Sequence, residues 1–150
     1  MLESSLMKKL LLPAAALMAA TLAWAADAPA PVVRTAGEVD WHASGDLPPG
    51  AEYHLMYEDP RTHAVQTLVR MPSGYALPPH THSADETILV LKGRLELTVG
   101  GRTTSLGAGG YATIPAGAPL AFKARGFGGV QFMAAFAGPY DAKPAAPPAK

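Results

Sequence analysis

The chain has 150 residues, of which 49% are hydrophobic and 16% charged, and twelve basic residues balance twelve acidic ones. A chain of this length is expected to form one domain, and a net charge of zero gives no electrostatic reason to expect nucleic acid or an anionic membrane as a partner. The absence of cysteine excludes disulfides, so the domain must be stabilised by its core alone or by its core and a bound metal.

The first 25 residues have the pattern of a secretory signal peptide. Lys8 and Lys9 precede an Ala/Leu-rich apolar run, residues 10–22, which is followed by the small-x-small site Ala23-Trp24-Ala25. The run is shorter than the ~20 apolar residues that a membrane-spanning helix needs. We therefore expect cleavage near Ala25, no stable membrane insertion afterwards, and a periplasmic or secreted mature protein.

The mature chain is predicted to be a single β domain between two Pro/Ala-rich ends. Residues 26–45 are expected to form an N-terminal linker and arm, and residues 141–150 a disordered tail. Residues 46–140 show short β-like segments separated by Gly/Pro turns, with no sustained helical period. The predicted strands are 53–57, 65–71, 87–92, 94–99, 111–114, 120–123 and 130–136. This pattern indicates a small antiparallel barrel or double-sheet sandwich, all β, with little or no helix.

Two of the predicted strands have distinct burial patterns. Residues 87–92 are almost wholly apolar, which predicts a strand buried on both faces. Residues 94–99 alternate between apolar and polar side chains, which predicts one buried face. Gly100-Gly101 is expected to form a two-residue hairpin turn after them. The outward face of 87–92 then needs cover, either from another sheet or from a second subunit in a homodimer.

Two histidines and a glutamate lie within seven residues, between two glycines. They are Gly74, His80, His82, Glu86 and Gly93. Imidazole and carboxylate groups are preferred ligands of divalent transition metals. His80 and His82 share one face of a strand, but a straight strand would carry Glu86 about 20 Å from His80, at ~3.3 Å per residue. A turn at residues 83–85 is therefore expected to fold Glu86 back toward the histidines.

These residues resemble the first motif of the cupin superfamily, G-x5-H-x-H-x3-E-x6-G, at every fixed position. The second motif, G-x5-P-x-G-x2-H-x3-N, is matched at Gly109, Pro115 and Gly117, but Leu120 stands in place of its histidine ligand and Ala124 in place of its asparagine. The LPPGA stretch at 47–51 and the AGPY stretch at 137–140 are also similar to small exported cupins. The resemblance covers roughly residues 46–136. It implies a double-stranded β-helix, a small jelly-roll barrel, with His80, His82 and Glu86 as the remaining metal ligands near one end.

Two interpretations of the missing ligand are open. Two histidines and one carboxylate with open positions are the makeup of the facial triad of non-haem Fe(II) oxygenases, which favours a metal-dependent, dioxygenase-like enzyme. The sequence does not distinguish Fe, Mn, Zn or Ni. The alternative is a non-catalytic module that binds or senses a small molecule with weak or no metal.

Further residues are candidates for supporting roles. Gln131 and His54 could replace the fourth ligand, and Tyr75 and Asp85 could assist the chemistry. The apolar segment 120–122 stands where most cupins present a polar ligand. It predicts an aliphatic wall, and with it a small-molecule partner that has an apolar portion.

Overall fold

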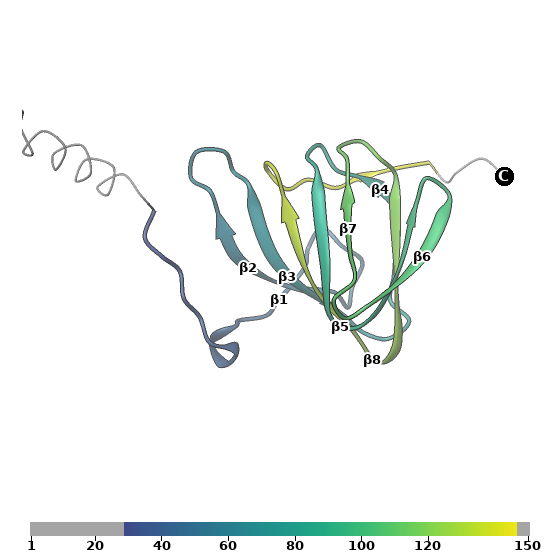
Figure 1. The fold of residues 1–150 in the computed structure, drawn as a ribbon, viewed down its shortest axis with the longest axis horizontal. Helices are drawn as coiled ribbons and strands as arrows, with labels where there is room; N and C mark the ends of the chain where they lie inside the picture. Colours follow the sequence, from purple (N-terminus) through teal and green to yellow (C-terminus); the bar gives the residue numbers. More distant parts are fainter. Residues whose placement is uncertain (1–28, 147–150) are drawn as a thin grey trace, which may run out of the picture. The chain divides into compact units, whose positions relative to one another are not determined.

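The computed structural model describes residues 29–146 (Figure 1), so the predicted signal peptide lies outside the described residues. The described chain falls into two units. Residues 29–33 have no regular secondary structure, and residues 34–146 contain every element named below. Within residues 29–146, no helix is long and apolar enough to cross a membrane.

The second unit is built almost wholly from strands, which confirms the predicted fold class. In chain order its elements are a 3-10 helix η1 (Ala36–Glu38) and strands β1 (His42–Ala43), β2 (Glu52–Glu58), β3 (Val65–Met71), β4 (Ala76–Thr81), β5 (Glu86–Val99), β6 (Arg102–Gly107), β7 (Tyr111–Ile114), β8 (Leu120–Phe136) and β9 (Lys143–Pro144).

Two long antiparallel strands, β5 and β8, form the centre of the sheet. They pair from Glu86 opposite Phe136 to Val99 opposite Leu120. β3 pairs with the second half of β8 and β4 with its first half, while β2 continues the sheet from β3 and both β6 and β7 pair with β5. The sheet curls round into a small barrel (Figure 1).

Glycines allow the long strands to bend and to approach other backbone closely. Four of the predicted strands are halves of two long ones. β5 contains the predicted strands 87–92 and 94–99, and β8 contains 120–123 and 130–136. At the bends, Gly93 and Gly129 have φ of +80° and +75°. A Cβ on Gly93 would lie 2.0 Å from the Gly129 carbonyl oxygen, and one on Gly129 would lie 2.0 Å from the Met71 oxygen. No other residue fits this backbone without rearrangement.

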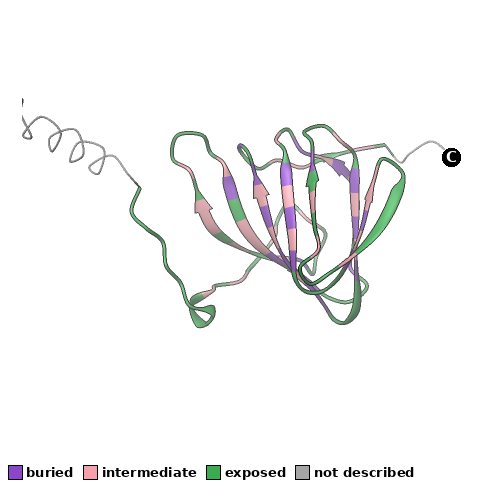
Figure 2. Ribbon diagram, viewed as in Figure 1, coloured by how far each residue is buried: buried purple, intermediate pink, exposed green. Residues whose placement is uncertain are grey.

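The hairpin prediction is confirmed, whereas the burial prediction for 87–92 is wrong. Val99 pairs with Arg102 around Gly100-Gly101, both of which have positive φ. The inward residues Ile88 and Val90 are at most 1% exposed, but Leu91 on the opposite face is 45% exposed. Figure 2 shows this alternation along the strands. A barrel has a single interior, so each strand buries one face, and the apolar outer residues of β5 remain partly open.

The end of the chain also differs from the expected disordered tail. Lys143 and Pro144 form β9, which pairs with Thr81 and His80 of β4, and the Ala145 amide donates to the Pro79 carbonyl at 3.0 Å. These bonds hold residues 143–145 against β4, whose edge still has backbone groups to pair. Residues 147–150 lie outside the described residues.

Candidate functional site

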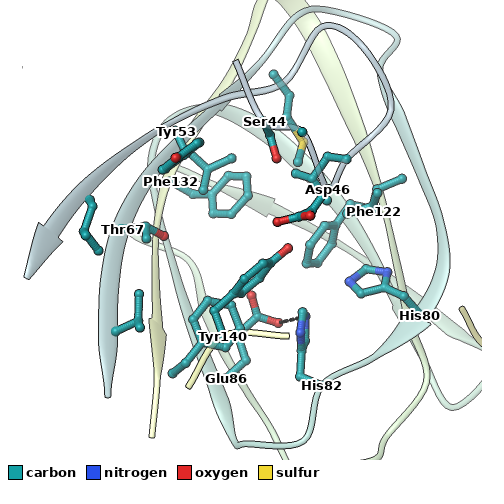
Figure 3. A pocket seen from close by; sticks show the side chains of 18 of the residues that line it. Ser44, Asp46, Tyr53, Thr67, His80, His82, Glu86, Phe122, Phe132 and Tyr140 are labelled. Carbon is teal, nitrogen blue, oxygen red and sulfur yellow. Dashed lines mark ion pairs between the residues drawn. The ribbon is translucent and has the colours of Figure 1, made fainter. Parts of the chain in front are cut away.

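A cavity of about 280 Å³ opens into the barrel. His80, His82 and Glu86 line it together, as the spacing predicted (Figure 3). Five aromatic side chains also line it: Tyr53, Phe122, Phe132, Phe136 and Tyr140. The cavity therefore combines one group of metal-ligand side chains with a largely apolar surround, the usual makeup of a small-molecule site.

Backbone carbonyls fix both histidine rings. His80 Nδ1 lies 2.8 Å from the Pro78 oxygen, and His82 Nδ1 is hydrogen-bonded to the Asp141 oxygen. A carbonyl can only accept, so each Nδ1 carries a hydrogen and, in the neutral ring, each Nε2 carries a lone pair. Histidines that ligate a metal are commonly oriented in this way.

Glu86 is folded back to the histidines by the predicted turn. It opens β5 and is 2% exposed, and its Oε2 lies 3.4 Å from His82 Nε2. Within the described part of the chain, this buried Oε2 has no hydrogen-bond partner. An anionic oxygen that faces an imidazole lone pair is unfavourable without a cation between them. Either a proton on His82 or a metal ion would supply that cation.

The pKa values of the two histidines are shifted in opposite directions. Burial lowers the pKa of His80, and the Pro78 carbonyl offsets this only in part. Burial also opposes protonation of His82, but the Glu86 carboxylate and the Asp141 carbonyl outweigh it and raise its pKa. His80 is therefore neutral at pH 7, with its Nε2 lone pair available, whereas His82 holds a proton more readily.

The three side chains are neighbours but do not converge on one point. The His80 and His82 rings are 4.9 Å apart between centroids and 83° from parallel, and the His80 ring also packs against Phe122 at 5.6 Å. Among residues 29–146, no three His, Cys, Asp or Glu side chains are arranged so that they could hold a metal ion. The donor types fit a divalent metal, but ligation by all three would require side-chain movement from this arrangement.

The sequence-based candidates for a fourth ligand do not line the cavity. His54 Nδ1 lies 2.9 Å from the Asp40 carbonyl oxygen, and Gln131 pairs with Arg70 across β3 and β8. Both have the parity opposite to their cavity-lining neighbours on the same strands, such as Leu55 and Phe132.

The other predicted residues have structural roles. The Tyr75 hydroxyl donates to the Pro48 carbonyl at 2.7 Å, and Asp85 Oδ1 accepts from the Ala116 amide at 2.8 Å. Leu120 pairs with His80 in register and is 2% exposed in the core. Phe122, the last residue of the predicted apolar segment 120–122, packs against His80 and lines the cavity, which aliphatic side chains such as Val69 and Leu77 also line.

Tyr140 is a site residue that the sequence reasoning missed. Its ring contacts His82 at 5.8 Å and Phe136 at 5.1 Å between centroids. Although Tyr140 is 37% exposed, its hydroxyl points into the cavity (Figure 3). Burial there raises the pKa of the phenol to about 12, and the Asp46 and Glu86 carboxylates add to the effect. The AGPY stretch, Ala137–Tyr140, was the available signal.

Asp141 joins the C-terminal segment to the histidine turn. Its carboxylate accepts from the Ser83 amide at 2.7 Å and from the Ser83 hydroxyl at 2.6 Å, and Lys143 Nζ lies 3.1 Å from it. The Ser83 hydrogen bonds hold the pKa of Asp141 at about 2. The Asp141 backbone carbonyl, which orients His82, is thus held in place by its own side chain.

Comparison with known proteins gives one family and a set of similar folds. Residues 67–136 match the family model described as Cupin domain. Over 51 residues the chain is 49% identical to quercetin 2,3-dioxygenase from Bacillus subtilis (strain 168), a match that spans 33% of this chain and 15% of that protein.

Solved structures share the fold at low sequence identity. The polyketide cyclase RemF from Streptomyces resistomycificus aligns with a TM-score of 0.65 and 20% identity, over 77% of this chain and 85% of that one. A putative acetylacetone dioxygenase from Methylibium petroleiphilum PM1 aligns with a TM-score of 0.63 and 19% identity, over 81% and 85% of the two chains.

Proposed function

Because the chain belongs to the cupin superfamily, we propose that His80, His82 and Glu86 hold a divalent transition metal and that the barrel is a dioxygenase-like enzyme acting on a small molecule with an apolar portion. The observation that carries the proposal is the buried Glu86 Oε2, which lies 3.4 Å from His82 Nε2 and lacks a hydrogen-bond partner in the described residues. A cation between these atoms removes an unfavourable contact.

When bound, the metal would supply Lewis acidity and open coordination positions for ligand oxygens. The protein's own residues prepare the site for it. The Pro78 and Asp141 carbonyls direct both Nε2 lone pairs away from the backbone. The aromatic wall keeps water from the donors, and the Tyr140 hydroxyl, with a pKa of about 12, remains a hydrogen-bond donor at neutral pH.

Two names among the similar proteins support the dioxygenase class. One is the quercetin 2,3-dioxygenase, matched over 51 residues, and the other is the putative acetylacetone dioxygenase, which shares the fold. Folds of this kind support more than one chemistry, so the class of reaction rests on the donor set and the cavity.

Metal analysis of the protein purified from its native compartment tests the proposal. We expect about one divalent ion per chain, on the donor types present, and near-complete loss in the His80→Ala, His82→Ala double variant. The His54→Ala, His63→Ala double variant is the matched control, since neither residue lines the cavity. Unchanged metal content in the first variant would refute the ligand assignment. Oxygen uptake with candidate substrates then tests the reaction class.

A non-catalytic binding role is the second candidate. It is favoured by the lack of a three-ligand arrangement in the described residues. It predicts that a ligand raises the melting temperature equally before and after chelator treatment. If the chelator abolishes the stabilisation, this candidate fails.

Export and dimerisation complete the proposal. The signal-peptide pattern of residues 1–25 predicts cleavage near Ala25, which N-terminal sequencing of the exported protein would test. The outer face of the barrel exposes Leu91 and Tyr111, by 45% and 71%, and a second copy could cover it. A monomer in light scattering at micromolar concentration would remove the dimer.

A further inference from the structure

The cavity has a charge bias that the metal-ligand motif does not account for. Three carboxylates line it, Asp46, Glu58 and Glu86, and none of its described lining residues is lysine or arginine. The basic side chains among the described lining residues are His80 and His82, and both lie close to Glu86, so a ligand carboxylate or phosphate has no lysine or arginine to pair with and would lie near fixed negative charge.

One of these acidic groups, Glu86, is buried inside the cavity, whereas Asp46 and Glu58 line it as exposed residues. Glu86 is 2% exposed and its Oε2, without a hydrogen-bond partner among the described residues, faces the cavity (Figure 3). Four of the five aromatic rings form two edge-to-face pairs around the same space, with the Phe122 and Phe132 centroids 5.9 Å apart and the Phe136 and Tyr140 centroids 5.1 Å apart. Aromatic faces carry partial negative charge, which favours neutral and cationic partners.

Asp46 is the carboxylate whose charge is least compensated. Glu58 is paired with His63 at 2.8 Å, and Glu86 lies beside His82. Asp46 is exposed in the arm that precedes β2, and in Figure 3 its carboxylate lies beside the Tyr140 hydroxyl at the cavity. Its negative charge helps to raise the pKa of the Tyr140 hydroxyl.

We propose that the cavity selects uncharged or cationic ring compounds and rejects the corresponding carboxylates, with Asp46 as the specificity-determining residue. The proposal deepens the proposed function, on which it rests for the identity of the site, by naming the charge class of its ligand. Because Asp46 is exposed, solvent screens part of its charge, and its repulsion should weaken binding of an anion by roughly several-fold.

Three probes of matched size test the selection in the full chain after metal removal by chelator. They are 2-phenylethanol, 2-phenylethylamine and phenylacetate, and ligand-observed NMR gives their dissociation constants. We expect the alcohol and the amine to bind at least about tenfold more tightly than the carboxylate. Asp46→Asn should lower the ratio of the dissociation constants of phenylacetate and 2-phenylethanol several-fold. Asp40→Asn, which removes an exposed charge outside the lining, should leave this ratio unchanged.

The outcomes separate this proposal from the metal proposal. Three results would overturn the proposed selection. They are equal affinity for phenylacetate and 2-phenylethanol, an affinity ratio that Asp46→Asn leaves unchanged, and no binding of any probe at millimolar concentration. None of these results depends on metal. A protein that purifies without metal yet keeps the expected order of probes contradicts the metal-dependent function and supports the selection.

Discussion

The two sides of the cavity differ in how they are encoded. The motif side, made by β4, the turn 83–85 and the start of β5, places His80, His82 and Glu86 within seven residues. The other side, called here the chain-end side, is made by Ser44–Leu47 and by Tyr140. Ser44 and Tyr140 are 96 residues apart in the sequence. The motif side supplies the donor atoms. The chain-end side orients one of them, His82, through the Asp141 carbonyl and adds the Asp46 carboxylate to the lining, so similarity in the motif alone does not define the ligand.

The largest effect should come from breaking the motif side at Gly93. Gly74 and Gly93 frame the motif with nearly the same φ, +81° and +80°, but only at Gly93 would a Cβ meet backbone, at 2.0 Å from the Gly129 oxygen. We expect Gly93→Ala to lower the free energy of unfolding by about 3 kcal/mol or more, measured by denaturant titration.

Gly74→Ala is the matched control. A Cβ on Gly74 would have no other atom within 4 Å, so only the left-handed backbone conformation opposes alanine, at a cost of about 1–2 kcal/mol. Equal losses in the two variants would show that the bend of β5 relaxes around an added methyl group.

The motif side was largely predictable from the sequence because its information is local. Strand parity placed His80 and His82 on one face, and the distance argument required the turn that folds Glu86 back. The Gly100-Gly101 hairpin followed from the conformational freedom of glycine. The continuity of β5 through Gly93 was not predicted, since a glycine within apolar sequence looks the same whether it ends a strand or bends it.

The chain-end side was not predictable by the same reasoning. Pairing of β9 with β4 joins residues about 60 positions apart, and Pro/Ala composition indicates disorder whether or not a free strand edge is available. Gln131 and His54 looked suitable as ligands by type, but their parity turns them away from the cavity. Of the apolar segment 120–122 that was expected in the wall, Phe122 lines the cavity, whereas Leu120 lies in the core.

The next largest effect tests whether the C-terminal segment orients His82. Asp141→Ala removes the bonds to Ser83 while the backbone carbonyl that accepts from His82 Nδ1 remains. We expect zinc affinity, measured by competition with a chelating dye, to fall about tenfold, as for other partners of metal-binding histidines. Asp141→Asn, which keeps one acceptor, should recover part of the loss.

A separate readout excludes general destabilisation by Asp141→Ala. The Nδ1 hydrogen of His82, followed by nitrogen-15 NMR, should exchange faster in the variant while the melting temperature changes little. Asp40→Ala should change neither quantity. Unchanged exchange and unchanged zinc affinity in Asp141→Ala would mean that His82 is oriented without help from the chain end.

Glu86→Gln should lower metal binding without lowering the stability of the metal-free protein. An amide can donate to the His82 Nε2 lone pair that now faces the buried carboxylate oxygen. In chelator-treated protein at pH 8, where His82 holds its proton less, we expect the free energy of unfolding to stay equal or rise by about 1 kcal/mol. Metal content should fall.

Glu96→Gln provides the control for this prediction, since it removes the partly exposed ion pair with Arg125, which contributes little to stability. A loss of stability in Glu86→Gln with full metal content would show that the carboxylate is a structural group rather than a ligand.

The smallest effect is the opening of the C-terminal segment in acid. The folded pKa of Asp141 is about 2, below the ~3.9 of an unfolded aspartate. Its carboxylate therefore stabilises the folded segment above about pH 4, and this contribution is lost as the pH falls through about 2. The effect is small because Asp141 and Lys143 are partly exposed and screened. Hydrogen exchange at the Ala145 amide, which bonds Pro79, should accelerate over this range relative to Asp141→Asn. A constant difference between the two proteins from pH 6 to pH 2 would mean that backbone pairing of β9 alone holds the segment, and that the Ser83 contacts only follow it.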